Sequence, residues 1–235
     1  MITVILCGGK GLRYGNNKPK GLAQIGDKPI LQHVMEIYSK QGHNDFIVVL
    51  GHMCKEIENY FSSIDHDYNI EFVHIEKNMN KGGALYMAKQ YIQEENFFCT
   101  YCDGVANIKL SDLLDNHIKS NNIVTITAIK PYHEFGIIVF GNNNKIIKFR
   151  EKPQMNEWTN GGFFVFKKDI FDHIYCPEDN LETDVFGRLV NKEKIGGFKH
   201  FGFWNTINTQ KDEETLNKKY EKYIKDGTIL EWFDI

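Results

Sequence analysis

The first half of the chain carries short apolar runs that alternate with stretches of helical periodicity. In Pro29–Gln41, for example, apolar residues recur every three to four positions, as on the buried face of a helix. This alternation of strand and helix is typical of a parallel, right-handed, doubly wound sheet. The predicted strands are residues 2–6, 45–50, 70–76 and 97–102, and the predicted helices are residues 29–41, 55–61, 83–92 and 111–119.

The pattern changes after residue 120. Short strands joined by polar turns such as Gly141–Asn144 favour antiparallel pairing, and the tail predicts a charged, lysine-rich helix over residues 210–226. The predicted strands are residues 124–130, 136–140, 146–150 and 162–166. We therefore expect one α/β domain over residues 1–235, in which a doubly wound, mostly parallel sheet gains an antiparallel sheet and a C-terminal helix.

Composition narrows the function classes. The chain has 235 residues, of which 42% are hydrophobic and 25% charged, as in globular proteins with a full core. A net charge of −3 gives no general affinity for nucleic acid or anionic membranes, so any cationic site must be local. No apolar stretch approaches the roughly 20 residues of a membrane span, and the N-terminus lacks the basic region of a signal peptide.

The five cysteines are odd in number and irregularly spaced, which favours a reducing, cytoplasmic location. Cys99 and Cys102 form a C-x-x-C pattern inside an apolar strand. Residues three apart on a strand point to opposite faces, and no second pair completes a zinc site. We therefore predict that both are buried apolar residues.

The segment after the first predicted strand is rich in glycine and cations. It reads Gly8–Arg13 and continues to Lys18-Pro19-Lys20. Residues 1–26 hold four cations and no carboxylate, and glycines let backbone N–H groups approach a ligand closely. A donor-rich, cationic loop at the carboxyl end of a strand is typical of a polyphosphate site. The spacing matches neither a P-loop nor the dinucleotide fingerprint.

Taken in order, the motifs resemble those of the sugar-phosphate nucleotidyltransferase family, and particularly its glucose-1-phosphate cytidylyltransferase branch. The resemblance covers nearly the whole chain. Its elements are residues 8–13, 18–20, 25–31, 82–85, 101–105, 151–153, 160–164 and 202–204. Asp103-Gly104-Val105 and Gly202-Phe203-Trp204 favour the cytidylyl branch.

The resemblance implies a Rossmann-like fold, with residues 1–120 as the nucleotide-binding part and 121–235 as the acceptor-binding part. It implies transfer of CMP from CTP to a small phosphorylated acceptor, with Mg²⁺ as cofactor and pyrophosphate as leaving group. The implied catalytic residues are Arg13 and Lys20. The implied nucleotide-binding residues are Leu6, Gly8, Gly9, Lys10, Gly11, Gly82, Gly83 and Asp103. The implied acceptor-binding residues are Glu151, Lys152, Asn160 and Gly161. The implied metal ligands are Asp103 and, more weakly, Asn208. The family also forms homo-oligomers, but the sequence does not set the oligomeric state.

Three departures leave the acceptor open. The stretch between Arg13 and Lys18 is about four residues shorter than in the glucose-1-phosphate branch; Ala84 stands where that branch carries arginine; and Asn208 stands where it carries a second metal-binding aspartate. One alternative acceptor is L-glutamine phosphate, which would give CDP-L-glutamine for capsule phosphoramidate synthesis. A catalytically silent, nucleotide-binding regulator is a second alternative, and an NAD-dependent oxidoreductase is a third that lacks its fingerprint.

Overall fold

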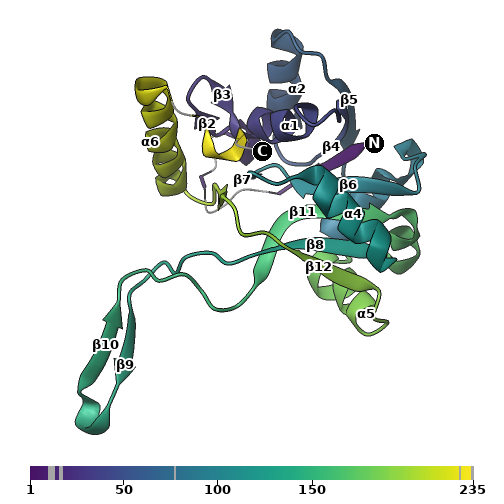
Figure 1. Cartoon of the computed structure of the whole chain (residues 1–235). Helices are drawn as coiled ribbons and strands as arrows, with labels where there is room; N and C mark the ends of the chain where they lie inside the picture. Colours follow the sequence, from purple (N-terminus) through teal and green to yellow (C-terminus); the bar gives the residue numbers. More distant parts are fainter. Residues whose placement is uncertain (10–13, 16–17, 77, 228, 234–235) are drawn as a thin grey trace.

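A computed structural model describes residues 1–9, 14–15, 18–76, 78–227 and 229–233. Its central element is a seven-stranded sheet in the order β12-β8-β11-β6-β1-β4-β5 (Figure 1). Every neighbouring pair is parallel except those made by β11, which runs antiparallel to both β6 and β8. The strands are β1 Thr3–Cys7, β4 Asp45–Leu50, β5 Asn69–His74, β6 Asn96–Tyr101, β8 Val124–Ile129, β11 Thr159–Lys167 and β12 Ile195–Lys199.

Helices cover both faces of this sheet. Successive side chains of a strand point to opposite faces, and here the side chains on both faces are apolar. In β1, Ile5 and Cys7 point into one buried cluster, and Val4 and Leu6 point into the other. The first cluster receives α1, α2 and α4, and the second receives α3 and α5. The helices are α1 Ile30–Ser39, α2 Cys54–Ser63, α3 Lys81–Met87, α4 Leu110–Ser120, α5 Phe186–Val190 and α6 Gln210–Asp226. Shorter helical turns are η1 Lys20–Leu22, η2 Lys89–Tyr91, η3 Asn142–Asn144, η4 Lys168–His173, η5 Leu181–Val185 and η6 Glu231–Phe233.

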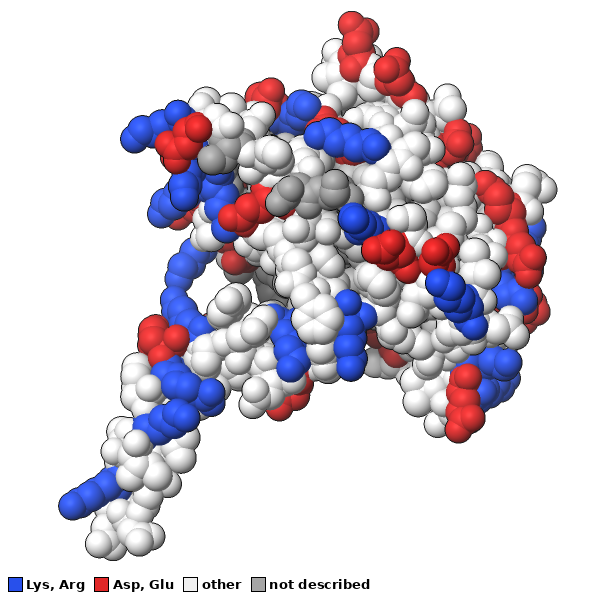
Figure 2. Space-filling model, viewed as in Figure 1, with Lys and Arg blue, Asp and Glu red and all other residues white. Residues whose placement is uncertain are grey.

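Three small antiparallel sheets lie outside the central one. They pair β2 Gln24–Ile25 with β3 Lys28–Pro29, β7 Gly104–Ala106 with β13 Trp204–Thr206, and β9 Ile137–Phe140 with β10 Ile146–Arg150. The β9–β10 hairpin projects from the body as an arm (Figure 1), and Lys and Arg side chains gather along it (Figure 2). Its turn contains Asn143 and Asn144, both with positive φ, a conformation that asparagine tolerates well.

The predicted fold class is confirmed, and several elements match closely. Residues 45–50 and 210–226 are strand and helix with the predicted bounds. The helix predicted at 83–92 instead starts at Lys81 and ends at Met87, followed by the separate turn η2. The antiparallel additions divide between β11, which joins the central sheet, and the separate arm. β12 was not predicted, because Gly196 and Gly197 interrupt the apolar pattern of this edge strand.

The prediction for the cysteines is confirmed. Cys99 and Cys102 are buried and belong to opposite clusters, and all five cysteines are free thiols. In the part of the chain that the structure describes, no helix combines the length and apolar character needed to cross a bilayer.

Candidate active site

The carboxyl ends of β1 and β6 lie side by side, since Leu6 pairs with Tyr101 in parallel register. The segment after β1 and Asp103 after β6 therefore meet at one edge of the sheet, where ligands of such folds bind. Gly8 approaches Gly51 after β4 so closely that a Cβ on Gly51 would lie 2.5 Å from the Gly8 carbonyl oxygen. Gly51 therefore requires glycine, and it was not predicted from the sequence; a Cβ on Gly8 would meet only the tip of the Ile75 side chain, at 2.7 Å.

The predicted loop residues fall partly within the described chain. Leu6 is buried in the core, so only its backbone is available to a ligand at the sheet edge. Gly9 is exposed and has open space around its Cα. Lys10, Gly11 and Arg13 lie outside the described residues, so their assigned roles stay predictions.

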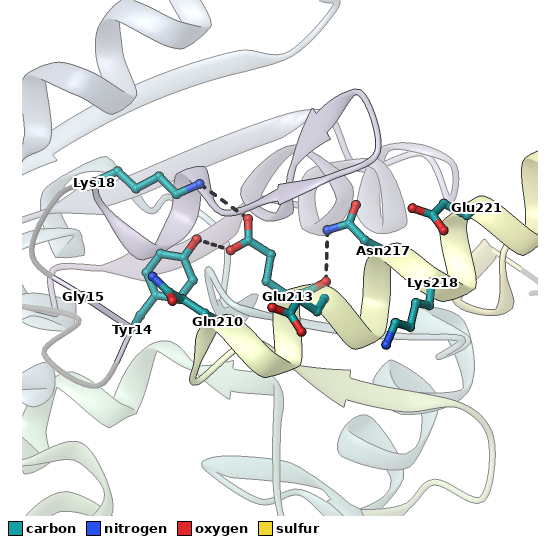
Figure 3. Close-up of a pocket in the computed structure, with 9 residues that line it drawn as sticks. Tyr14, Gly15, Lys18, Gln210, Glu213, Asn217, Lys218 and Glu221 are labelled. Atoms are coloured by element: carbon teal, nitrogen blue, oxygen red, sulfur yellow. Dashed lines mark hydrogen bonds and ion pairs between the residues drawn. The ribbon is translucent and has the colours of Figure 1, made fainter.

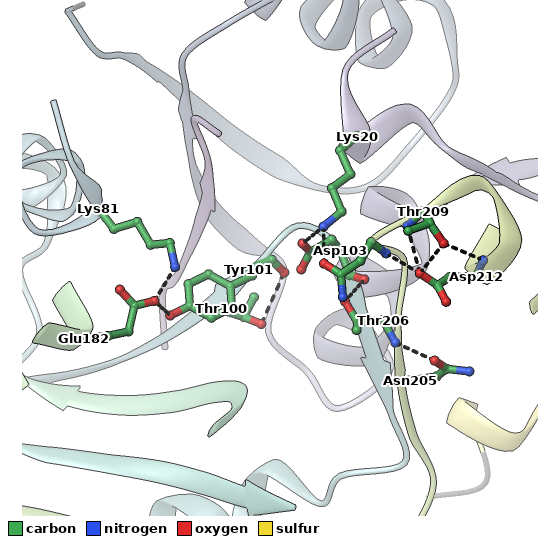
Figure 4. A network of polar contacts seen from close by, with 11 residues as sticks. Lys20, Lys81, Thr100, Tyr101, Asp103, Glu182, Asn205, Thr206, Thr209 and Asp212 are labelled. Atoms are coloured by element: carbon green, nitrogen blue, oxygen red, sulfur yellow. Dashed lines mark hydrogen bonds and ion pairs between the residues drawn. The ribbon is translucent and has the colours of Figure 1, made fainter. Parts of the chain in front are cut away.

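Lys20 joins two other predicted residues, Asp103 and Asn208, into one cluster. Its Nζ donates to Asp103 Oδ2 at 2.5 Å and to Asn208 Oδ1 at 2.9 Å (Figure 4). The side chains of Lys20 and Asp103 retain 17% and 22% exposure, so this ion pair is accessible from solvent. Lys20 is 83 and 188 residues away from its partners in sequence, and only the fold brings them together.

The backbone around Asp103 and Asn208 is tightly fixed. The Asp103 carbonyl oxygen accepts from the Ile207 amide and the Thr206 hydroxyl, each at 2.9 Å, within the β7–β13 pairing. The Asn208 amide donates to Asp212, which forms a capping box with Thr209 at the start of α6. The strand pair and the helix cap thereby hold the side-chain oxygens of Asp103 and Asn208 in place.

The two oxygens form an incomplete cation site. Asp103 and Asn208 already converge on one positive group, the Lys20 ammonium. Mg²⁺ accepts carboxylate and amide oxygens and is commonly held by one or two protein ligands plus phosphates and water. No group of three or more His, Cys, Asp or Glu within the described ranges could hold a metal. The residues therefore fit a magnesium ion that substrate phosphates complete.

Asn160 and Gly161 occupy the start of β11, at the same edge of the sheet. Asn160 Oδ1 accepts the Gly162 amide at 2.9 Å, and Gly162, with φ of +80°, lies against the Tyr101 ring. The Gly161 carbonyl accepts from Trp204 Nε1 at 2.7 Å, which joins two of the sequence motifs. The structure thus places both predicted acceptor residues beside Tyr101 and Trp204.

Glu151 and Lys152 are placed differently. Both are exposed at the root of the arm, where Lys152 has a φ of +41°. Among the contacts of the described residues, neither side chain bonds to the other, to Lys20 or to Asp103. The structure does not bring them into the Lys20 cluster, and their role at the acceptor stays a prediction.

Gly82 and Gly83 lie in the first turn of α3 and are buried against the segment Pro177–Asp179. The Gly82 amide donates to the Asp179 carbonyl oxygen at 2.9 Å. A Cβ on Gly82 would lie 2.6 Å from that oxygen, and one on Gly83 would lie 2.2 Å from the Pro177 carbonyl oxygen. Close backbone packing therefore requires both glycines, whatever they contribute to nucleotide binding.

We expect Gly83→Ala to destabilise the protein by about 2 kcal/mol, because the new methyl group overlaps fixed backbone atoms. The free energy of unfolding from urea titration measures this. Gly187→Ala is a matched control, since a Cβ there meets nothing within 4 Å and alanine favours helix α5. Equal stability of the two variants would contradict the packing role.

A second polar network was missed from the sequence. Lys81 Nζ contacts Glu182 Oε1, which also accepts from the Tyr101 hydroxyl at 2.7 Å (Figure 4). Burial opposes charge on Glu182, but hydrogen bonds from Lys81 and Tyr101 outweigh it and lower the pKa of this carboxyl. Lys81 lies one turn before Ala84, so α3 carries a cation near the position where the glucose-1-phosphate branch is expected to carry arginine. No local signal in the sequence marks Glu182.

Comparison with known proteins assigns the chain to a family. The family model described as nucleotidyl transferase matches residues 2–227. The chain belongs to the nucleotidyl transferase family. It is 34% identical to a probable glucose-1-phosphate cytidylyltransferase of Bacillus subtilis, over 94% of this chain and 97% of that protein. It is 30% identical to a glucose-1-phosphate cytidylyltransferase of Salmonella typhimurium, over 94% and 96%.

Solved structures of the family share the fold. HddC from Yersinia pseudotuberculosis superposes with a TM-score of 0.74 at 19% identity, covering 93% of this chain and 99% of that one. The inositol-1-phosphate CTP transferase from T. maritima superposes with a TM-score of 0.68 at 16% identity, covering 94% and 96%. The predicted family, enzyme class and Rossmann-like architecture are confirmed.

Proposed function

We propose that this nucleotidyltransferase transfers CMP from CTP to a small phosphorylated acceptor of the sugar 1-phosphate type and releases pyrophosphate. The product would be a CDP-linked precursor for capsule or surface polysaccharide. The cluster of Lys20, Asp103 and Asn208 carries the proposal, because it joins a lysine ammonium to a carboxylate and an amide oxygen at the sheet edge where Gly8 and Gly9 follow β1. The similarity to glucose-1-phosphate cytidylyltransferases over nearly the whole chain supports CTP as donor.

The reaction requires alignment and charge neutralisation rather than a covalent nucleophile. An oxygen of the acceptor phosphate attacks the α-phosphorus of CTP, and the bond from that phosphorus to the oxygen bridging to the β-phosphate breaks. Pyrophosphate leaves with the electron pair of that bond. Lys20 would offset the negative charge that develops on the α-phosphate oxygens.

Mg²⁺, held by Asp103 and Asn208, would supply charge neutralisation on the phosphates when bound. Lys20 bonds to both of these oxygens, so its ammonium would give up at least part of the two contacts for Mg²⁺ and the triphosphate to bind there. Asn160 and Gly161 would contact the body of the acceptor, and Lys152, oriented by Glu151, would hold its phosphate.

We expect Asn208→Asp to lower the Mg²⁺ concentration for half-maximal activity roughly threefold to tenfold, because a second carboxylate adds charge to a hard-cation site. A magnesium titration of pyrophosphate release measures this. Asn122→Asp, at a surface position that contacts Ser120, controls for the added charge alone. An unchanged magnesium requirement in Asn208→Asp would remove this residue from the metal site.

A substrate panel tests the proposal. The protein is incubated with Mg²⁺, each of CTP, UTP, dTTP, ATP and GTP, and a set of acceptors that includes glucose 1-phosphate and L-glutamine phosphate. We expect pyrophosphate with CTP and one class of acceptor. Turnover with L-glutamine phosphate alone would move the product to CDP-L-glutamine. Silence across the panel would favour the regulatory alternative.

A further inference from the structure

The polar face of α6, from Glu213 to Tyr220, is bonded to described residues between Tyr14 and Asp27, on both sides of Lys20. Glu213, Asn217 and Tyr220 lie on successive turns of α6 and face this segment. An open pocket of about 650 Å³ lies between the first part of the segment and the helix (Figure 3).

Glu213 gathers three donors from the segment onto one carboxylate. Oε2 accepts from the Tyr14 hydroxyl at 2.5 Å; Oε1 accepts from the Gln24 amide at 2.8 Å and from Lys18 Nζ at 3.4 Å (Figure 3). Tyr14 is 5% exposed and the Glu213 side chain 17% exposed, so water competes weakly for these bonds. Burial, and then Glu213 itself, raises the pKa of Tyr14, which therefore stays protonated and donates.

The next two turns of α6 continue the attachment. Asn217 donates to the Gln24 carbonyl oxygen at 2.7 Å and accepts from the Gly26 amide at 2.8 Å. The Tyr220 hydroxyl donates to Asp27 at 2.6 Å, and its ring fills the space where a side chain on Gly26 would lie. The segment is thus fixed on both sides of Lys20.

The same helix also sets the other end of the Lys20 side chain. Asn208, which accepts from Lys20 Nζ, is followed directly by the capping residue Thr209 of α6. A shift of α6 would move both the backbone that carries Lys20 and the amide oxygen that receives its ammonium. α6 and its Glu213 contacts therefore determine where the ammonium lies.

We propose that Glu213 is a positioning residue of this enzyme, which holds Tyr14, Lys18 and the Gln24 amide on α6 so that the Lys20 ammonium is aligned with the α-phosphate. The proposal rests on the proposed function for its catalytic part. Glu213 contacts no reacting atom, and its effect passes through Tyr14, Lys18 and the Gln24 amide.

The test combines hydrogen exchange with kinetics on the full chain. In Glu213→Ala, amide exchange in peptides covering residues 14–26 should quicken, because the Gln24 N–H loses its acceptor. The kcat with CTP should fall about tenfold while the KM for CTP changes less than threefold, since misplacement of a charge-stabilising group acts on the transition state. Glu213→Gln should recover part of kcat by accepting from Tyr14 and Gln24. Glu214→Ala, exposed on the same helix, should match the wild type in both measurements.

Tyr14→Phe removes one bond without removing the carboxylate, and serves if Glu213→Ala fails to fold. It should show smaller changes in the same directions. Unchanged exchange in residues 14–26, or faster exchange with wild-type kcat, would overturn the proposal. Hydrogen exchange is measured without substrate, so it decides by itself whether Glu213 holds the segment. A wild-type protein that lacks turnover with CTP would refute the proposed function instead.

Discussion

Lys20→Ala should lower kcat by about 10²–10³-fold, the usual effect of removing one preorganised charge-stabilising donor. Lys20 is the residue through which Asp103 and Asn208 are connected, and it is the described cation closest to both oxygens. The KM for CTP should rise less than kcat falls, because the charge it offsets develops in the transition state. Steady-state pyrophosphate release gives both constants.

Lys119→Ala is the matched control for this variant, since Lys119 is exposed on α4, away from the cluster. It should leave kcat unchanged. Lys20→Arg should retain part of the activity, because it keeps the charge but not the position of a compact ammonium. A Lys20→Ala enzyme within threefold of wild-type kcat would refute the assigned role.

Arg188→Ala should destabilise the protein by about 3 kcal/mol, the low end expected when a buried ion pair loses one partner. The Arg188 guanidinium bonds to both oxygens of Asp179, at 2.7 and 2.8 Å. The Asp179 side chain is 5% exposed and would be left without its counter-charge, whereas the Arg188 side chain is 29% exposed. This pair stabilises the segment that receives Gly82 and Gly83, so its loss should also loosen the start of α3.

The ion pair of Asp179 and Arg188 should also make the stability of the protein depend on pH. Hydrogen bonds from Arg188 hold the pKa of Asp179 well below its usual range. Its contribution to stability is therefore present above the unfolded-state pKa of about 3.9 and is lost as pH falls below that value. The difference in unfolding free energy between wild type and Arg188→Ala should shrink below about pH 4. A difference that grows in acid would contradict this role, and Arg188→Lys should be intermediate.

Much of the fold follows from local sequence. The short apolar run Asp45–Leu50 is the buried strand that its length and branched residues favour, and Gln210–Asp226 is bounded by a capping threonine and by Gly227 with positive φ. Local patterns do not specify partners, however. The antiparallel run of β11 between β6 and β8, and the parallel addition of β12, depend on contacts between residues far apart in sequence.

For the candidate site, too, the sequence predicted single residues but not the contacts between them. The motifs identified Lys20, Asp103, Asn160 and Asn208 individually, and the fold then brought Lys20, Asp103 and Asn208 together. Glu213 looked like one more charge on a solvated helix, because its partners are 189 to 199 residues earlier in the chain. Gly82 and Gly83 were assigned to the nucleotide, although the nearest atoms to their missing side chains belong to Pro177–Asp179.

Mass analysis of a complete reaction tests the proposed chemistry most directly. The wild-type protein is incubated with CTP, Mg²⁺ and the acceptor that gives turnover, and the products are quantified. We expect pyrophosphate and a CDP-linked acceptor in equal amounts, with neither formed by Lys20→Ala at a comparable rate. Free CMP in place of the CDP-linked product, or equal product from UTP or dTTP, would contradict a cytidylyltransferase.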